Sequence, residues 1–165
     1  MGKVVYRSYL SLGSNVGNRE EHLRDAIHRL GPKGQVISIS SFYETEPVEF
    51  TEQAWFINCA VALETTETPE RLMNRLLRIE QEMGRLRTEK KGPRTIDIDM
   101  LLFGDAIVNT PALTIPHPAM HRRRFVLEPL AEIAPDARHP LFNRTVRELR
   151  DALPAGQVVR KLQHN

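Results

Sequence analysis

The sequence has little cysteine and no long apolar run, and each absence narrows the classes of protein to which it can belong. Its single cysteine, Cys59, cannot form an internal disulfide, which favours a reducing compartment. Every apolar run is well below the roughly 20 residues that a membrane-spanning helix needs. Residues 1–7 lack the apolar core of a secretory signal peptide. We therefore expect a cytoplasmic protein without a membrane span.

Internal repeats, low-complexity tracts and interdomain linkers are also missing. The chain has 165 residues, of which 41% are hydrophobic and 27% are charged, and these values are ordinary for a globular protein. A chain of this length buries about two thirds of its unfolded surface in one core. We expect residues 1–165 to form a single domain.

The spacing of the apolar residues predicts alternating strands and helices. The predicted strands cover residues 5–12, 36–43, 56–63 and 96–102, and the predicted helices follow the N-cap residues Asn18 and Thr68 and end near Gly31 and Gly84. This order is typical of ferredoxin-like domains. The fold class is predicted to be α+β, a ferredoxin-like two-layer sandwich with a βαββαβ core. C-terminal additions are expected, namely strands near 106–108, 113–115 and 158–162 and helices near 126–133 and 146–153.

Two aspartates on the fourth predicted strand are the most informative residues. Asp97 and Asp99 are two positions apart, so their carboxylates lie side by side on one face of the strand. Like charges at this spacing repel unless a cation neutralises them, and Mg²⁺ is commonly bound by one or two carboxylates together with substrate phosphates. The pair predicts a magnesium site, and an exposed polar strand face is the alternative.

Basic residues surround this strand in the sequence. The segment 85–94 has no apolar periodicity, contains Arg85 and Arg94, and ends next to the aspartates, so it is interpreted as a cationic loop for phosphates. The cluster 121–124 follows His117 and provides a second cationic surface. Solvated surface charge remains the alternative for either cluster, and a structural hydrogen bond remains the alternative for His117.

Phosphate-binding glycine motifs are absent. Residues 11–18 contain two glycines but neither Gly-x-x-x-x-Gly-Lys nor Gly-x-Gly-x-x-Gly, so this stretch is interpreted as a turn. Asn58 has two interpretations, one as a hydrogen-bonding group for a heterocycle and one as an ordinary polar residue at a strand end. Cys59 has no motif around it and is expected in the core.

Several motifs together resemble the family of 6-hydroxymethyl-7,8-dihydropterin pyrophosphokinases. The similarity runs from about residue 5 to about residue 135. It is carried by Gly13-Ser14-Asn15, Ser41-Phe42-Tyr43-Glu44-Thr45, Asn58 with Ala60-Val61, Ile79-Glu80, Gly84-Arg85, Gly92-Pro93-Arg94-Thr95-Ile96-Asp97-Ile98-Asp99 and Pro116-His117.

The resemblance implies a diphosphotransferase of folate biosynthesis. Such an enzyme moves the pyrophosphoryl group of ATP to 6-hydroxymethyl-7,8-dihydropterin and releases AMP. Matching positions imply two Mg²⁺ ions on Asp97 and Asp99, with Arg85 and Arg94 assisting catalysis. They imply nucleotide contacts from Glu80, Arg85, Arg94, Thr114, His117 and Arg123, and pterin contacts from Thr45, Val48, Phe56, Asn58 and Phe125.

Three positions depart from the pattern of some family members. Lys91 and Pro118 stand where an aromatic residue occurs in some relatives, and Leu77 stands where some have glutamine.

Two other functions fit parts of the pattern. A nucleotidyl transferase would also use paired aspartates, but it would release pyrophosphate. An RNA-recognition module would need exposed aromatic residues in a Lys/Arg-Gly-Phe pattern, which is absent. We expect a monomer that binds small molecules and binds neither nucleic acid nor membrane.

Overall fold

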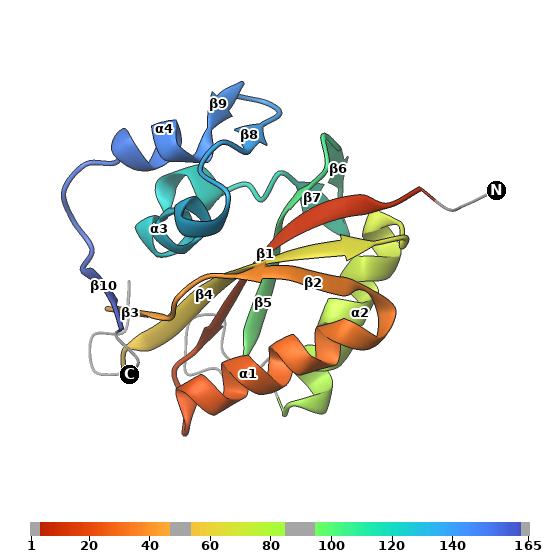
Figure 1. Cartoon of the computed structure of the whole chain (residues 1–165), viewed down its shortest axis with the longest axis horizontal. Helices are drawn as coiled ribbons and strands as arrows, with labels where there is room; N and C mark the ends of the chain where they lie inside the picture. Colours follow the sequence, from red (N-terminus) through yellow and green to blue (C-terminus); the bar gives the residue numbers. More distant parts are fainter. Residues whose placement is uncertain (1–3, 47–53, 85–94, 163–165) are drawn as a thin grey trace.

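The computed structural model describes residues 4–46, 54–84 and 95–162. These ranges form a mixed α/β fold with an antiparallel sheet (Figure 1). The strands are β1 (Tyr6–Ser14), β2 (Gln35–Ile39), β3 (Tyr43–Thr45), β4 (Phe56–Thr65), β5 (Asp97–Phe103), β6 (Val108–Thr110), β7 (Leu113–Ile115), β8 (Arg138–His139), β9 (Arg144–Thr145) and β10 (Val159–Lys161). The helices are α1 (Arg19–Leu30), α2 (Pro69–Glu82), α3 (Arg124–Ile133) and α4 (Val146–Asp151), with 3₁₀ turns at Gly31–Lys33 and Met120–Arg122.

The main sheet has the order β10-β3-β4-β1-β5, and β2 also pairs with β4. The predicted strand over residues 36–43 is in fact two strands, β2 and β3, which lie along successive parts of β4. The break occurs at Ser40. Its Oγ accepts the N–H of Ala60 at 2.8 Å and donates to the carbonyl of Ser41 at 2.8 Å. A side chain therefore replaces part of the strand ladder, which apolar periodicity cannot show.

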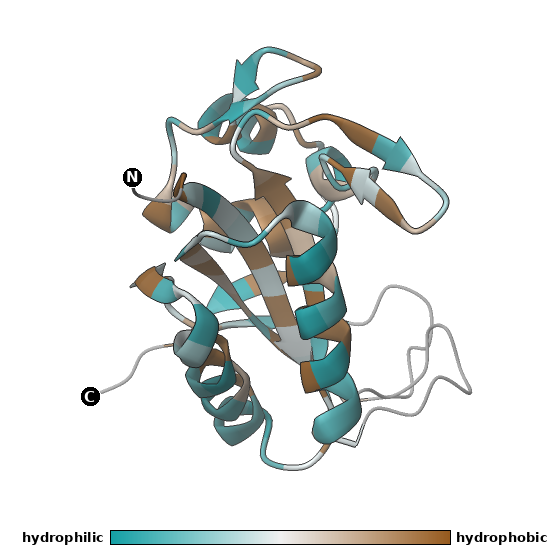
Figure 2. Ribbon diagram, turned by 90° about the vertical axis from the view of Figure 1, so that its right-hand side faces the viewer, coloured by the Kyte–Doolittle hydropathy of each residue, from teal (hydrophilic) through white to brown (hydrophobic). Residues whose placement is uncertain are grey.

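Helices α1 and α2 lie where the capping residues and apolar stripes predicted, and they cover one face of the sheet (Figure 1). The side chains of Asn18 and Thr68 cap the two helices by accepting the N–H groups of Glu21 and Arg71. The core beneath them contains buried residues of both helices and three strands, including Leu23, Leu30, Leu72, Leu76, Ile79, Leu12, Cys59 and Ile98. Much of the hydrophobic colour lies on the strands, whereas the helices are largely hydrophilic along their outer sides (Figure 2).

The opposite face of the sheet is covered only in part. Helices α3 and α4 pack over it through a second apolar cluster that includes Ala60, Leu101, Leu127, Leu130 and Leu149. Both faces are covered at the end of β5, where every residue from Met100 to Phe103 is buried. The other end of this face, which carries Asp97 and Asp99, stays partly exposed. Among the described helices, none is long and apolar enough to cross a membrane.

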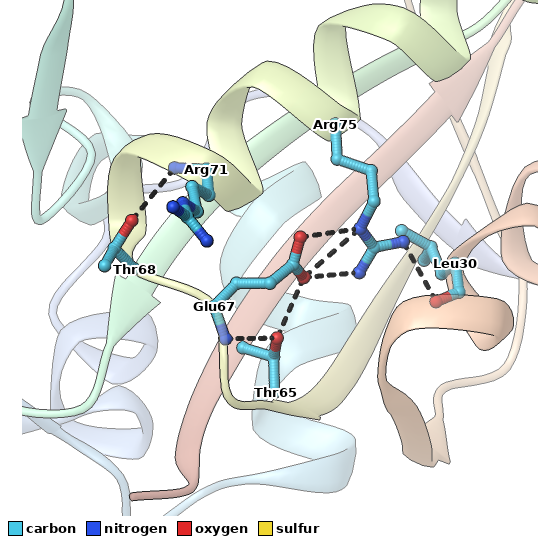
Figure 3. Close-up of polar contacts among 6 residues, drawn as sticks. All are labelled: Leu30, Thr65, Glu67, Thr68, Arg71 and Arg75. Atoms are coloured by element: carbon cyan, nitrogen blue, oxygen red, sulfur yellow. Dashed lines mark hydrogen bonds and ion pairs between the residues drawn. The ribbon is translucent and has the colours of Figure 1, made fainter. Parts of the chain in front are cut away.

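A mostly buried arginine of α2 forms an ion pair with Glu67, just before the same helix, and a hydrogen bond to the end of α1 (Figure 3). Arg75 of α2 donates to both carboxylate oxygens of Glu67, at 2.8 to 3.2 Å, and to the carbonyl of Leu30 at the end of α1 at 3.0 Å. The side chains of Arg75 and Glu67 are only 11% and 15% exposed. The hydroxyl of Thr65 also donates to Glu67 at 2.8 Å. Burial favours the neutral acid, but the hydrogen bonds from Arg75 and Thr65 outweigh it and lower the pKa of Glu67.

Replacement of Arg75 by alanine should reduce the free energy of unfolding by about 2 to 4 kcal/mol, because it leaves a mostly buried carboxylate and the Leu30 carbonyl without their donor. Arg71→Ala is the matched control, since Arg71 is an exposed arginine one turn away on α2. It should cost less than about 0.5 kcal/mol. Urea unfolding of the three proteins measures both values. A similar loss in both variants would contradict a specific role for Arg75.

Candidate active site

The register of three adjacent strands brings the predicted metal and pterin residues onto one face of the sheet. Gly13 of β1 lies opposite Asp97 of β5 on one side and opposite Asn58 of β4 on the other. Ser11 lies in the same way between Asp99 and Ala60. Paired residues of antiparallel strands share a face, and neighbouring strands are about 4.8 Å apart. Asn58 and Asp97 are therefore separated by about 10 Å, the width of two strand spacings.

Gly13 allows the amide of Asn58 to approach the backbone of β1. A Cβ atom at position 13 would lie 2.5 Å from Asn58 Nδ2 and 3.6 Å from a ring carbon of Phe56. The strand predicted over residues 5–12 continues to Ser14, so the turn interpreted within residues 11–18 begins only after β1. Gly13 was missed as a site residue. The available signal was a glycine inside a strand, which often marks a close approach to the backbone.

Thr45 orients the Asn58 amide. Its hydroxyl donates to Asn58 Oδ1 at 2.7 Å, and both residues are at least 95% buried. Because the oxygen already accepts this bond, the Nδ2 donor lies on the side of Gly13. Phe56, which pairs with Thr45, is only half-buried. These residues form a buried polar group beside an accessible ring.

His117 lies near the aspartates from another direction. Its backbone N–H donates to the carbonyl of Leu101 in β5 at 3.0 Å. Burial, and then the charge of Arg123, lower the pKa of His117 to about 4, while the charge of Asp97 opposes the shift. The ring is therefore neutral at pH 7. Its Nδ1 accepts the N–H of Ala119 at 3.1 Å, so the ring proton is on Nε2.

The predicted residues Arg123 and Phe125 lie together at the start of α3. The guanidinium of Arg123 is 5.5 Å from the centre of the Phe125 ring, within the range of a cation–π contact. Phe125 is half-buried and packs against the second apolar cluster. Thr114 is exposed on β7. Arg123 is thus linked electrostatically to His117 and by contact to Phe125.

Glu80 has a structural contact that the sequence did not predict. The residue is 2% exposed on α2, on the side of the sheet opposite the aspartates, and its Oε2 accepts the N–H of Ile98 at 2.8 Å. Ile98 stands between Asp97 and Asp99 on β5, which is an edge strand of the main sheet in the described ranges. Glu80 therefore supports the strand that carries both carboxylates. Its contact with the nucleotide stays a prediction.

The donor set of Asp97 and Asp99 fits a magnesium ion that shares its coordination with phosphates. Both side chains are half-buried, and they point to the same open face. The described ranges contain no group of three or more His, Cys, Asp or Glu residues placed to hold a metal ion. Two carboxylates with room for water and phosphate oxygens suit Mg²⁺, which rarely has an all-protein site. Arg85, Arg94 and Val48 lie outside the described residues, and their roles stay predictions.

The fold and the site together define a class of protein, namely an α/β protein that presents two carboxylates, a buried amide and a neutral histidine on one partly open sheet face. The family model of 7,8-dihydro-6-hydroxymethylpterin-pyrophosphokinase (HPPK) matches residues 9–135. The chain belongs to this family.

Individual relatives agree with the family match. The 2-amino-4-hydroxy-6-hydroxymethyldihydropteridine pyrophosphokinase of Bacillus subtilis is 46% identical over 76% of this chain and 77% of its own length. The protein of the same name from Methylorubrum extorquens is 44% identical over 86% of this chain and 90% of its own length. The folic acid synthesis protein fol1 of Schizosaccharomyces pombe is 41% identical over 90% of this chain. This chain spans only about a fifth of the fol1 protein, 20% of its length.

Solved structures show the same fold. The HPPK-DHPS A437G protein of Plasmodium falciparum with SDX-DHP superposes with a TM-score of 0.73 at 18% identity, covering 91% of this chain and 46% of that protein. The overall arrangement of helices and strands is therefore shared despite the low identity.

Glu80→Leu should lower the free energy of unfolding by about 1 to 3 kcal/mol, because the N–H of Ile98 loses its acceptor. Glu80→Gln keeps an oxygen that can accept the same bond and should cost less. Chemical unfolding of both variants measures the difference. An equal loss would indicate that the charge of Glu80, rather than this hydrogen bond, stabilises β5.

The pKa of His117 should respond in opposite directions to its two charged neighbours. An NMR titration of the unaltered protein should give a midpoint near 4. Arg123→Ala should raise this pKa and Asp97→Asn should lower it, because each change removes one charge that acts on the ring. Protonation favours the unfolded chain, so the contribution of His117 to stability should be lost as the pH falls from about 6.5 towards 4. Shifts in the same direction would contradict this geometry.

Proposed function

We propose that this protein transfers the pyrophosphoryl group of Mg-ATP to 6-hydroxymethyl-7,8-dihydropterin, giving the pterin diphosphate and AMP in folate biosynthesis. Family membership supports this activity, as do the names of the bacterial relatives. The observation that carries it is the register at Gly13, which sets Asp97 and Asn58 on one face of the sheet, about 10 Å apart. A phosphate-binding centre and a heterocycle-binding amide are thereby neighbours.

The pterin is proposed to bind at Phe56 and Asn58, with Phe125 on its other side and Thr45 behind the amide. Flat aromatic rings stack favourably on Phe side chains. A buried amide such as Asn58 discriminates strongly between ligands. A ligand that cannot form a hydrogen bond with the amide leaves it buried without a partner, which weakens binding. Val48 is proposed to complete the pterin-binding site.

The nucleotide is proposed to bind at the other end of the face. His117 is neutral and carries its proton on Nε2, so it can donate a hydrogen bond to a phosphate oxygen without changing its charge. Arg123 supplies a positive charge beside it, and Thr114 supplies an exposed hydroxyl. Arg85 and Arg94 are proposed to complete the nucleotide contacts and to stabilise the charge that develops during transfer. Glu80 is proposed to act on this side through its hydrogen bond to the N–H of Ile98, which lies between the two aspartates.

In the proposed reaction the hydroxymethyl oxygen of the pterin attacks the β-phosphorus of ATP. An O–P bond forms at the β-phosphorus, the bond from this phosphorus to the α,β-bridging oxygen breaks, AMP leaves, and the hydroxyl proton is released. No side chain acts as a nucleophile. Asp97 and Asp99 would hold two Mg²⁺ ions, which when bound neutralise phosphate charge and favour ionisation of the hydroxyl. The protein itself positions the two substrates and excludes water from them.

We also propose that residues 1–165 form one domain with a ferredoxin-like core. Three observations support this core: the outer strand β5 lies beside β1, β1 lies beside β4, and α1 and α2 pack on the same face. The C-terminal elements from β6 to β10 would then be additions to that core.

The purified protein, incubated with Mg-ATP and 6-hydroxymethyl-7,8-dihydropterin, should yield AMP and the pterin diphosphate. Asp97→Asn and Asp99→Asn should each lower the rate by at least about 10²-fold, a loss typical of removing a group that stabilises transition-state charge. Both should also weaken Mn²⁺ binding measured by paramagnetic resonance in the presence of an ATP analogue. Asp105→Asn is the control, because Asp105 is exposed just beyond β5.

Three results would oppose the proposal. Release of pyrophosphate would indicate a nucleotidyl transferase, and release of ADP would indicate a simple kinase. Near-normal rates and Mn²⁺ binding in both aspartate variants would remove the metal assignment while leaving the reaction itself in place.

A further inference from the structure

Strand β10 extends the sheet beside the strand that carries Thr45. It pairs with β3 in antiparallel register, with Val159 opposite Thr45 and Arg160 opposite Glu44. Residues 136–162 lie beyond the segment 9–135 that matches the family model. Their contacts with β3 nevertheless reach the side of the site proposed for the pterin.

Glu44 is the centre of these contacts. Neighbouring residues of a strand face opposite sides, so Glu44 points away from the face on which Thr45 lies. Its side chain is 17% exposed and forms ion pairs with Arg19 at 3.0 Å and with Arg160. The hydrogen bond from Arg160 is the main cause that lowers the pKa of Glu44; burial opposes it and Arg19 adds to it. The carboxylate is therefore charged at neutral pH and joins two cations from distant parts of the chain.

The same two arginines hold Trp55, the residue before β4. Arg19 donates to the carbonyl of Trp55 at 2.7 Å. The guanidinium of Arg160 lies 5.7 Å from the centre of the Trp55 ring, within the range of a cation–π contact. Trp55 directly precedes Phe56, and Phe56 lies opposite Thr45. The cluster of Glu44, Arg19, Arg160 and Trp55 thus joins β10, β3, the start of α1 and the start of β4.

Hydrogen bonds to Glu46 hold the segment that leads into β10. The side chain of Gln157 donates to the carbonyl of Glu46 at 2.7 Å, and the N–H of Val158 donates to Glu46 Oε1 at 2.8 Å. The N–H of Glu46 donates in turn to the carbonyl of Val158 at 3.3 Å. The C-terminal segment therefore contacts β3 through side chains as well as through the strand ladder.

We propose that Glu44 and Arg160 are positioning residues for the pterin, holding Thr45 and Phe56 at their places without touching the substrate. This inference rests on the proposed function. Thr45 orients the Asn58 amide through their 2.7 Å hydrogen bond, so a displacement of β3 would disturb both the amide and the ring beside it. The nucleotide side depends on β5, β7 and the start of α3. Within the described ranges, the contacts of this cluster involve β10, β3, α1 and Trp55 instead.

The test compares binding of the two substrates in the full chain. Arg160→Ala should weaken binding of 6-hydroxymethyl-7,8-dihydropterin about three- to ten-fold, the combined size of a lost ion pair and a lost cation–π contact. Affinity for a non-hydrolysable ATP analogue should stay within about two-fold. Arg160→Lys should recover part of the loss, because it keeps the positive charge. Arg147→Ala is the matched control, since Arg147 is 54% exposed and pairs with Asp136 in the same C-terminal segment.

A double-mutant cycle shows whether Arg160 acts through Glu44. Arg160→Ala should have less effect on pterin affinity in a Glu44→Gln background than in the unaltered chain, because the ion pair is already lost. Amide exchange should become faster at β3 in Arg160→Ala without any ligand. Unchanged pterin affinity in this variant, or equal loss for pterin and nucleotide, would overturn the inference and leave the proposed function standing. No pterin binding by the unaltered chain would overturn both.

Discussion

The antiparallel register of β1 between β4 and β5 determines where the candidate site residues of the sheet lie. Side chains alternate with a period of two, so a slip of one residue in either pair would turn Asp97 or Asn58 into the core beneath α1 and α2. The apolar partners of the same strands prevent such a slip, because Leu12, Cys59 and Ile98 would then face solvent. The core that stabilises the protein therefore also fixes the geometry of its site.

The two faces of the main sheet have different roles, because one forms the core and the other carries the candidate site. The face under α1 and α2 carries the main apolar core, whereas the other changes along its length from an apolar region under α3 to a polar region around Asp97. The polar region needs support because its groups are costly to bury without partners. Thr45 supports Asn58 and Glu80 supports the backbone between the aspartates, each through a hydrogen bond. The contacts of β10 with β3 extend this support to the edge of the sheet.

Local patterns predicted the main elements well, since each depends on neighbouring residues. Asn18 and Thr68 cap their helices as expected, and Thr145 adds a full capping box at α4 with Glu148. The pairing of Asp97 with Asp99 on one strand face was also available from spacing alone. The break at Ser40 and the covering of Leu101 and Leu102 by α3 were not available, because they depend on contacts with residues far away in the chain. The same reason hid the contact of Glu80 with Ile98.

The sequence alone determined which residues are candidates for the chemistry, because motifs such as Gly-Pro-Arg-Thr-x-Asp-x-Asp are contiguous. It also determined the local elements on which many of them lie. The tertiary structure decided how these pieces meet. It placed Gly13 between Asn58 and Asp97 in the sheet. It lowered the pKa of His117 through burial and the charge of Arg123. It also brought Arg160 to Glu44, which is 116 positions away in the chain. The physical reason is that strand pairing and burial depend on distant segments, whose register no local pattern encodes.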